Sequence, residues 1–417
     1  QKGDFEHLVI HSSIIRPAAN VYINEYIRRL KGGKWQSLHP LLDSLLQETF
    51  GIMVYQEDVS KVVMALADFT PAEADDLRKI ISKKHKERQI QDYKEQFFVG
   101  AGRKGVSQKT CDDIWNMILS FSGYSFCKPH SASYALVSFK SAYLRAHYPA
   151  EFIAAVISNQ GGYYSTFAYI SEARRMGLTI LLPDINLSEH HYKGRKHKVR
   201  VGFMQLKGIN KQVIKRLLKE RENGPFTSLA DFQNRVECDP SDMAILIKSG
   251  CFDTLEPNRA RPQLLWQARL APVGIHYSKN DTPSLFDQEQ PQRIPAPPEY
   301  DEYTIWQHEM DTLGFLLSRH PLTLYGDRLN EPNIVQAKDL KRYIKQRVKT
   351  VGWYIAGKIT STKNHDLMEF ISFEYTTAIY ETTFFPKTFA KFVHMLSRTR
   401  PFILESIVES HYGAITL

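Results

Sequence analysis

The chain has 417 residues, of which 43% are hydrophobic and 24% charged, and this composition excludes a collagen, a pure coiled coil and global disorder. Its length predicts about two to four domains at roughly 100–200 residues each. No run of about 18 apolar residues occurs, so we expect neither a membrane-spanning helix nor a membrane partner. The first residues show no signal pattern. We therefore expect a cytoplasmic protein, and a chain that is processed or, as we favour, a fragment of a longer one.

Several familiar chemical motifs are missing from the sequence. The four cysteines include no Cys-x2-Cys pair, which argues against a zinc ribbon, and they are too few for a disulfide scaffold. Their small number fits a reducing compartment. A phosphate-binding GxxxxGK[ST] loop and an HExxH metal motif are both absent from the sequence. A hydrolase is therefore left without a candidate nucleophile or metal cluster.

The positive charge is concentrated in two segments. The whole chain carries a net charge of +9, yet residues 193–221 alone hold eleven Lys and Arg against one Glu. Residues 78–109 hold ten Lys and Arg against three acidic residues, so the remainder of the chain is acidic. Two basic segments on an acidic chain indicate a polyanionic partner, and ordinary solvated helix faces are the alternative.

Residues 1–160 are expected to be mostly helical. Thr70 is a good N-cap, Pro71 suits a first turn, and Glu73 completes a capping box, so a helix should begin there. Pro149 predicts the start of another helix. Residues 160–190 then predict a helix that ends at Gly177, followed by a short strand.

Residues 200–260 contain two short glycine hairpins between helical segments, Leu-Lys-Gly-Ile-Asn at 206–210 and Ile-Lys-Ser-Gly-Cys-Phe at 247–252. This pattern is typical of a tandem helix-hairpin-helix, in which glycine lets the backbone approach a phosphate and the next helix offers its N–H groups. The alternative is a plain glycine helix cap, and we interpret the second hairpin as mainly structural. The candidate DNA-binding residues are Lys207, Gly208, Ile209, Asn210, Lys211, Lys215, Arg216 and Gly250.

The last third of the chain divides into a linker and a β-rich end. Residues 271–302 contain six prolines and enclose an exposed Leu285-Phe286 pair, which should dock onto a partner or onto the nearest domain. Residues 348–417 alternate like strands, with one helix before the last strand, and this order predicts an OB-fold barrel. Trp353, Phe370 and Phe373 could stack on single-stranded nucleic acid, although we favour core packing for each.

Three segments resemble bacterial DNA polymerase III alpha subunits, the family C polymerases. They are FGIMVYQEDVSKVVMALADFTPAEADDLRKIISKKHKE at 50–87, FSGYSFCKPHSASYALVSFKSAYLRAHYPAEFIAAVIS at 121–158 and LGFLLSRHPL at 313–322. The resemblance covers nearly the whole chain. It implies a multidomain α+β protein with mostly helical fingers, a tandem helix-hairpin-helix and a C-terminal OB-fold. The implied boundaries are fingers at 1–160, helix-hairpin-helix at 161–265, a linker with a degenerate clamp motif at 266–305, a connecting helical segment at 306–347 and the OB-fold at 348–417.

The resemblance implies that the chain binds primer–template DNA and an incoming dNTP for template-directed nucleotidyl transfer. In this family the palm aspartates that hold two Mg²⁺ ions precede the fingers. We therefore expect this part alone to be inactive, with no catalytic residue and no metal site of its own. Single-stranded template at the OB-fold is a further expected partner. A non-catalytic helix-hairpin-helix and OB nucleic-acid-binding module is the alternative, but it leaves the fingers motifs unexplained and predicts no nucleotide binding.

The residues that the resemblance assigns to the incoming triphosphate lie in two stretches of the fingers. They are Arg78, Lys79, Lys83, Lys84, Tyr124, Lys128 and His130. A cation there would neutralise charge as pyrophosphate leaves, and Lys83 and Lys84 could instead contact DNA. His130 could bind phosphate or donate a proton, with a core histidine as the alternative. Arg16 matches the family's Arg-Pro element.

This sequence departs from the common family pattern at several positions. Cys127-Lys128-Pro129-His130 stands for Asn-Lys-Ser-His, and Arg16-Pro17-Ala18 stands for Arg-Pro-Gly. Both departures favour the error-prone type of alpha subunit over the main replicase. The clamp motif retains Leu285 and Phe286 but has Thr282 where Gln is usual, so we expect weak or no binding to a sliding clamp.

Overall fold

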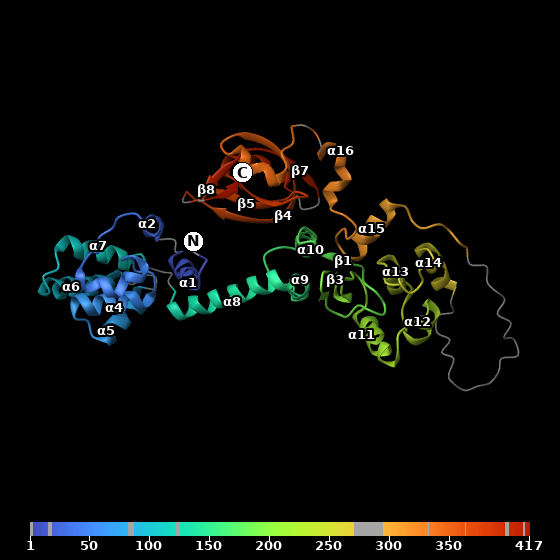
Figure 1. Ribbon diagram of the computed structural model, residues 1–417, viewed down its shortest axis with the longest axis horizontal. Coiled ribbons are helices and arrows are strands. Elements are labelled where there is room, and N and C mark those ends of the chain that lie inside the picture. Colours follow the sequence, from blue (N-terminus) through green and yellow to red (C-terminus); the bar gives the residue numbers. More distant parts are fainter. Residues whose placement is uncertain are drawn as a thin grey trace. The chain divides into compact units, whose positions relative to one another are not determined.

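The computed structural model describes residues 3–15, 19–81, 87–121, 126–270, 295–329, 331, 333–362, 364–396, 400–411 and 413–417 (Figure 1). Its contacts divide the chain into two compact units, Gln1–Tyr143 and Leu144–Leu417. The predicted domain boundaries stay predictions. Within the described residues, no helix is long and apolar enough to cross a membrane.

The first unit is helical. Its helices are α1 (Phe5–Ile14), α2 (Asn20–Leu30), α3 (Asp43–Leu46), α4 (Gln56–Ala67), α5 (Pro71–Ile81), α6 (Glu87–Arg103), α7 (Gln108–Leu119) and most of α8 (Lys128–His147), with 3₁₀ turns at Pro40–Leu42 and Gln47–Thr49. Helices α4 and α6 pack closely, because Gly100 has no side chain: a Cβ there would lie 2.3 Å from the carbonyl oxygen of Ala67. Phe97 and Trp115 fill the buried core.

Local capping explains why α5 begins where the sequence predicts. Glu73 Oε2 accepts hydrogen bonds from the backbone nitrogen of Thr70 at 2.8 Å and from its hydroxyl at 2.7 Å. The Glu73 amide in turn lies 3.3 Å from Thr70 Oγ1, which completes a capping box. Helix α9 (Pro149–Ser158) likewise begins at its proline. Both predicted helix starts are confirmed.

The second unit opens with a mixed α/β region. After α9 come α10 (Thr166–Arg175), β1 (Thr179–Leu181), β2 (Lys193–Arg195), β3 (Lys198–Arg200), α11 (Lys211–Glu220), α12 (Leu229–Arg235), α13 (Pro240–Lys248), α14 (Arg261–Leu270), α15 (Glu302–Thr312) and α16 (Gly326–Leu329). Strand β3 is central, parallel to β1 and antiparallel to β2. Leu313, Phe315 and Leu317, which follow α15, pack into the same core as Phe232 and Phe252. This core therefore joins segments on both sides of the Pro-rich linker.

The C-terminal part is a six-stranded curled sheet (Figure 1). Its strands are β4 (Arg347–Ser361), β5 (Leu367–Glu374), β6 (Ile379–Phe384), β7 (Pro401–Ile407), β8 (Glu409–His411) and β9 (Ala414–Thr416), in the order β7-β4-β5-β6-β9-β8. Helix α17 (Pro386–Phe392) lies between β6 and β7 in the chain, so the predicted helix is present, but three strands follow it where the sequence predicted one. The predicted fold class, multidomain α+β with helical fingers, helix-hairpin-helix and OB-fold, is confirmed.

The three aromatic residues of the sheet have different environments. Phe373 is fully buried and contacts Tyr354, Tyr380, Phe384 and Phe402, so its predicted core role is confirmed. Trp353 is half-buried against the same core. Phe370 is 44% exposed, so the prediction of core packing is wrong there. Neighbouring side chains on a strand point to opposite faces, and Phe370 lies on the face away from Phe373.

Candidate nucleotide and nucleic-acid sites

In the first unit, candidate residues from α5 and α8 meet at the N-terminus of α4. Gln56 is its first residue, and its Oε1 accepts a hydrogen bond from Arg78 Nη1 of α5 at 2.9 Å. The backbone N–H of Gln56 donates to the carbonyl oxygen of Phe126 at 3.1 Å, and Phe126 lies just before α8 begins. Two residues at or near the start of α8, Lys128 and His130, are thereby brought to the same helix end. A helix N-terminus carries partial positive charge and suits an anion.

The start of α4 is itself firmly held. Asp58 is 5% exposed, and its Oδ2 accepts hydrogen bonds at 2.9 Å from the backbone nitrogens of both Val54 and Tyr55. Burial raises the pKa of Asp58, and the two backbone hydrogen bonds oppose that rise. The buried capping carboxylate gives the surrounding side chains a rigid support.

Arg78 and Lys79 share one carboxylate. Arg78 Nη2 lies 2.8 Å from Asp75 Oδ1, and Lys79 Nζ lies 2.7 Å from Asp75 Oδ2. Hydrogen bonds from Lys79 and then from Arg78 lower the pKa of Asp75, and the hydrogen bond to Asp75 raises the pKa of Lys79. Asp75 therefore compensates part of the charge of both basic side chains.

Lys128 lies over an aromatic ring and beside a carboxylate. Its Nζ is 5.2 Å from the centroid of the Tyr55 ring and forms hydrogen bonds of 2.7 and 2.9 Å to the carboxylate of Glu48. The Lys128 amide lies 3.2 Å from Glu57 Oε2. An ammonium over an aromatic face is attracted by the ring. The Tyr55 ring and the Glu48 carboxylate together define the position of the Lys128 ammonium.

His130 is an exposed residue in the first turn of α8. Its ring stacks on Phe126 at 5.6 Å and meets Tyr134 edge-on at 4.8 Å between centroids. The alternative of a core histidine is therefore wrong. The ring is positioned by aromatic neighbours, and its exposure leaves it accessible to a ligand.

Some predicted site residues lie outside the described part of the chain: Arg16, Lys83, Lys84, Tyr124, Leu285 and Phe286. The sequence pattern did not point to Gln56 or Glu48, which contact Arg78 and Lys128. Only the packing of α4 against its neighbours brings those contacts about.

In the second unit, the first glycine hairpin leads directly into α11. Gly208 has a φ of +77°, a left-handed conformation that favours glycine. Asn210 caps the helix by accepting a hydrogen bond from the Gln212 amide at 2.9 Å, and its own amide donates to Asp242 Oδ1 at 2.8 Å. The amides of Gly208, Ile209 and Lys211 have no hydrogen-bond partner in the described residues. Three N–H groups at this hairpin are thus available to an anion.

The solvent face of α11 carries a lysine stripe, formed by Lys211, Lys215 and Lys219. These residues are spaced four apart and are all exposed, while Val213, Ile214 and Leu217 are buried. Residues four apart share one face of a helix. None of the three lysines forms an ion pair within the described ranges. Lys219 was not predicted as a site residue, although the same spacing would have found it.

Three other predicted DNA-binding residues make contacts within the protein, unlike the lysine stripe. Arg216 donates to the carbonyl oxygen of Glu237 at 2.6 Å and lies 3.2 Å from its carboxylate. Lys207 packs over Gly314, and its amide donates to the carbonyl oxygen of Thr312 at 2.7 Å. Gly250 is buried, and a Cβ there would meet Arg261 Nη2 at 2.6 Å. The backbone at Gly250 is therefore covered by Arg261, and a role of Gly250 in DNA binding stays a prediction.

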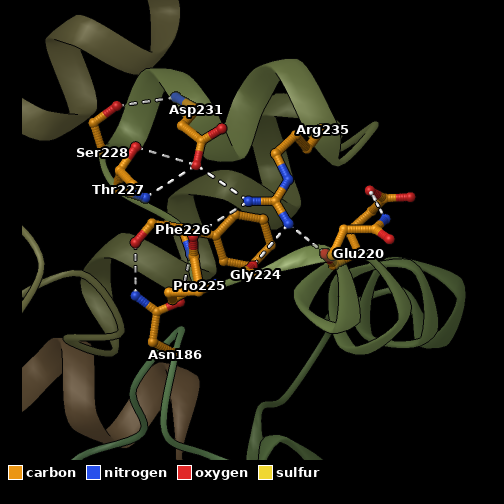
Figure 2. A network of polar contacts seen from close by, with 10 residues as sticks. Asn186, Glu220, Gly224, Pro225, Phe226, Thr227, Ser228, Asp231 and Arg235 are labelled. Atoms are coloured by element: carbon orange, nitrogen blue, oxygen red, sulfur yellow. Dashed lines mark hydrogen bonds and ion pairs between the residues drawn. The ribbon is translucent and has the colours of Figure 1, made fainter.

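A polar network fixes the loop between α11 and α12 (Figure 2). Arg235 donates through Nη2 to the carbonyl oxygens of Glu220 and Gly224, and through Nη1 to Asp231 Oδ2 at 3.2 Å. Its guanidinium also lies 4.4 Å from the centroid of the Phe226 ring. This arginine therefore ties the C-terminal end of α11 to α12 and holds the orientation of the lysine stripe.

A basic hairpin formed by β2 and β3 adds further cations. Arg195, Lys196 and Lys198 are exposed at its tip and form no ion pair in the described part of the chain. Gly194 lets the hairpin rest on α9, because a Cβ there would lie 2.1 Å from the carbonyl oxygen of Ala150. The hairpin and the lysine stripe together supply most of the cations of the basic segment seen in the sequence.

The described residues contain no group of three or more His, Cys, Asp or Glu side chains that could hold a metal ion. The acidic residues near the candidate nucleotide site are engaged with Arg78, Lys79 and Lys128. These residues do not fit a two-metal centre, and no chemical step is assigned to a metal on this part of the chain.

Comparison with known families agrees with this architecture. Residues 177–262 match a helix-hairpin-helix motif, and residues 1–105 match the bacterial DNA polymerase III alpha subunit finger domain. The class is therefore that of a helix-hairpin-helix protein with polymerase-type fingers.

The chain is also similar in sequence to whole DNA polymerase III alpha subunits from several bacteria. The chain is 32% identical over 98% of its length to a DNA polymerase III subunit alpha from Neisseria meningitidis serogroup A. It is 31% identical over 91% of its length to that of Treponema pallidum, and 32% identical over 82% to that of Thermus aquaticus. The predicted resemblance to DNA polymerase III alpha subunits is thereby confirmed. The chain spans 36%, 34% and 29% of the length of these three relatives.

Proposed function

We propose that this chain is the fingers-to-OB-fold part of a DNA polymerase III alpha subunit, which binds primer–template DNA and an incoming dNTP for template-directed nucleotidyl transfer. The observation that carries the proposal is the meeting of Arg78, Lys128 and His130 at the N-terminus of α4. Basic side chains and a helix N-terminus together favour a polyphosphate.

In this proposal, Arg78 and Lys79 neutralise the triphosphate and Lys128 approaches it from the start of α8. His130 lies in the same turn, where it would donate a hydrogen bond or a proton to a phosphate oxygen. The residues of this chain bind and orient the nucleotide. The metal ions and the carboxylates that hold them are supplied by another part of the whole subunit.

DNA would lie against the second unit. The N–H groups of the first glycine hairpin, the lysine stripe of α11 and the basic hairpin tip support a contact with the phosphate backbone. Such contacts give affinity and positioning without reading sequence. Single-stranded template at the OB-fold is proposed on the exposed ring of Phe370. Binding to a sliding clamp through Leu285 and Phe286 is proposed to be weak, and the departures at 127–130 favour an error-prone polymerase.

Titration of the chain with a fluorescent dNTP tests the nucleotide site. Arg78→Ala should weaken binding at least tenfold, because a charge-assisted contact to phosphate is lost. Arg103→Ala is the matched control, since Arg103 is an exposed arginine at the end of α6. The same Arg78→Ala change in the intact subunit should lower kcat/KM for nucleotide incorporation.

The alternative, a non-catalytic nucleic-acid-binding module, makes the opposite prediction. Absence of dNTP binding by the chain and by the intact subunit would favour that module. Unchanged binding in Arg78→Ala would instead remove Arg78 from the proposed site.

A further inference from the structure

A cavity of about 230 Å³ in the second unit is lined by Ser171, Arg174 and Arg175 of α10, by His320, and by Thr376 after β5. None of these residues belongs to the two sites described above. They come from the helix-hairpin-helix region, from the segment after α15 and from the curled sheet. The cavity therefore lies where three parts of the unit meet.

Two hydrogen-bond donors at this cavity have no partner among the residues that the structure describes. Ser171 is 3% exposed, and its buried hydroxyl makes no hydrogen bond. Arg174 donates through Nη2 to the carbonyl oxygen of Leu317, but its buried Nη1 is not hydrogen-bonded. A buried donor without an acceptor costs free energy, so each of these atoms favours an acceptor that enters the cavity.

His320 supplies a third donor. Its Nδ1 accepts a hydrogen bond from the Leu322 amide at 3.1 Å, so the proton of the neutral ring is on Nε2. Nε2 is buried without a hydrogen bond and lies 3.4 Å from Glu374 Oε2. The Phe167 ring packs against the imidazole at 5.6 Å and restricts its rotation.

The carboxylates around the cavity are largely occupied. Glu374 is fully buried, and its Oε1 pairs with Arg175, which leaves Oε2 as an acceptor without a hydrogen bond. Glu172 pairs with both Arg145 and Arg175. Glu309 accepts three hydrogen bonds through Oε2, from Leu317 and Ser318. Ser171 Oγ and Arg174 Nη1 therefore lack any partner among the described residues, whereas His320 Nε2 has no hydrogen bond but faces Glu374 Oε2 at ion-pair distance.

We propose that this cavity binds a phosphate group, whose oxygens accept hydrogen bonds from Arg174 Nη1, Ser171 Oγ and His320 Nε2. A tetrahedral oxyanion suits such a set because it accepts from several directions at once, and a guanidinium matches it in charge. The phosphate is either a free anion or a phosphodiester of a bound nucleic-acid strand. The proposal does not depend on dNTP binding in the first unit.

Calorimetric titration of the chain with inorganic phosphate in a chloride buffer tests the site. We expect one site, at least tenfold weaker binding in Arg174→Gln, and a smaller loss in Ser171→Ala. Arg342→Gln is the matched control, since this arginine is 74% exposed and pairs only with Asp339 among the described residues. It should bind phosphate like the wild type.

A short single-stranded oligonucleotide distinguishes the two sources. If phosphate displaces the oligonucleotide and Arg174→Gln weakens oligonucleotide binding, the source of the phosphate group is a nucleic-acid strand. Phosphate binding without any effect of Arg174→Gln on the oligonucleotide would identify a free anion. Nitrogen NMR signals of the His320 ring should shift when phosphate binds, a readout that also serves if Arg174→Gln does not fold. Absence of phosphate binding, together with oligonucleotide binding that is insensitive to Arg174→Gln and Ser171→Ala, would overturn the proposal.

Discussion

Asp75 Oδ1 binds one edge of the Arg78 guanidinium, at 3.0 Å from Nε and 2.8 Å from Nη2. Its third nitrogen donates to Gln56 at the start of α4. Arg78 is therefore oriented before any nucleotide arrives. The same carboxylate also forms an ion pair with Lys79. Asp75 therefore contacts two of the cations that we propose to bind the triphosphate.

Asp75→Asn should strengthen dNTP binding at low salt. The amide keeps the size of the side chain but removes a negative charge, while Gln56 still orients Arg78. A unit charge at about 4 Å is worth about 1 kcal/mol in water, so we expect roughly two- to fivefold tighter binding. Fluorescence titration in low and in high salt checks this. At high salt, screening should make the dNTP affinities of Asp75→Asn and the wild type nearly equal. Weaker binding in Asp75→Asn at both salts would mean that Asp75 mainly orients the arginine.

The lysine stripe of α11 should determine much of the salt dependence of DNA binding. Each phosphate contact contributes about 0.9 to the slope of log K against log salt on duplex DNA. The triple variant Lys211→Gln, Lys215→Gln, Lys219→Gln should therefore lower this slope by about 2 to 3. Fluorescence anisotropy with a primer–template duplex across a salt series gives the measurement.

Two controls separate this effect from general loss of charge. Glutamine at Lys338, Lys341 and Lys345, three exposed lysines before β4, should leave the slope nearly unchanged. Arg216→Gln should also change it little, because Arg216 contacts Glu237. An equal drop in slope for both lysine triples would show that DNA binding is not localised on α11.

Arg235→Ala should destabilise the second unit. The variant leaves the carbonyl oxygens of Glu220 and Gly224 and the carboxylate of Asp231 without their shared donor, and it removes the contact with Phe226 (Figure 2). Losing partly buried, charge-assisted hydrogen bonds of this kind costs about 2–4 kcal/mol. Urea unfolding followed by circular dichroism measures the loss. Arg259→Ala, which removes an arginine that is 46% exposed, should stay within about 0.5 kcal/mol of the wild type.

Features set by neighbours in the chain could be predicted from the sequence. The capping box of Thr70 and Glu73 joins residues three apart, and Pro149 begins its helix for a local reason. The lysine stripe also follows from local periodicity, since α11 places Lys219 beside Lys215 and turns Arg216 toward Glu237. The spacing of the lysines was therefore enough to include Lys219 and to separate Arg216 from the stripe, but the prediction did not sort the basic residues by helix face.

Contacts between distant residues could not be predicted in this way. Arg78 and Gln56 are 22 residues apart, and Lys128 and Glu48 are 80 apart. Their partners depend on how α4, α5 and α8 pack, which no local pattern specifies. Gly250 shows the opposite case: its hairpin sequence suits phosphate binding, but Arg261 from a later helix covers it. The resemblance to a known family, by contrast, correctly predicted polymerase-type fingers followed by a helix-hairpin-helix.

The acid stability of the first unit should depend on Glu25. Its carboxylate lies 2.6 Å from both Arg28 and Arg29, and hydrogen bonds from Arg28 and then Arg29 lower the pKa of Glu25 to about 2. A carboxyl whose pKa is lower in the folded than in the unfolded state stabilises the fold above the unfolded pKa, about 4.5. This contribution is lost as the pH falls toward 2. At pH 7 it should amount to about 0.5–1 kcal/mol, since the pair is partly exposed.

Glu25→Gln should therefore lower the free energy of unfolding at pH 7 and at pH 5, and its difference from the wild type should shrink between pH 4 and pH 2. Urea unfolding at these pH values measures the difference. Arg28→Ala is the matched comparison, because it leaves the bridge to Arg29, whose side chain is 17% exposed and also donates to the carbonyl oxygen of Phe50. Arg28→Ala should thus retain part of the pH dependence that Glu25→Gln abolishes. A difference between Glu25→Gln and the wild type that stays constant down to pH 2 would show that Glu25 acts through packing and not through its charge.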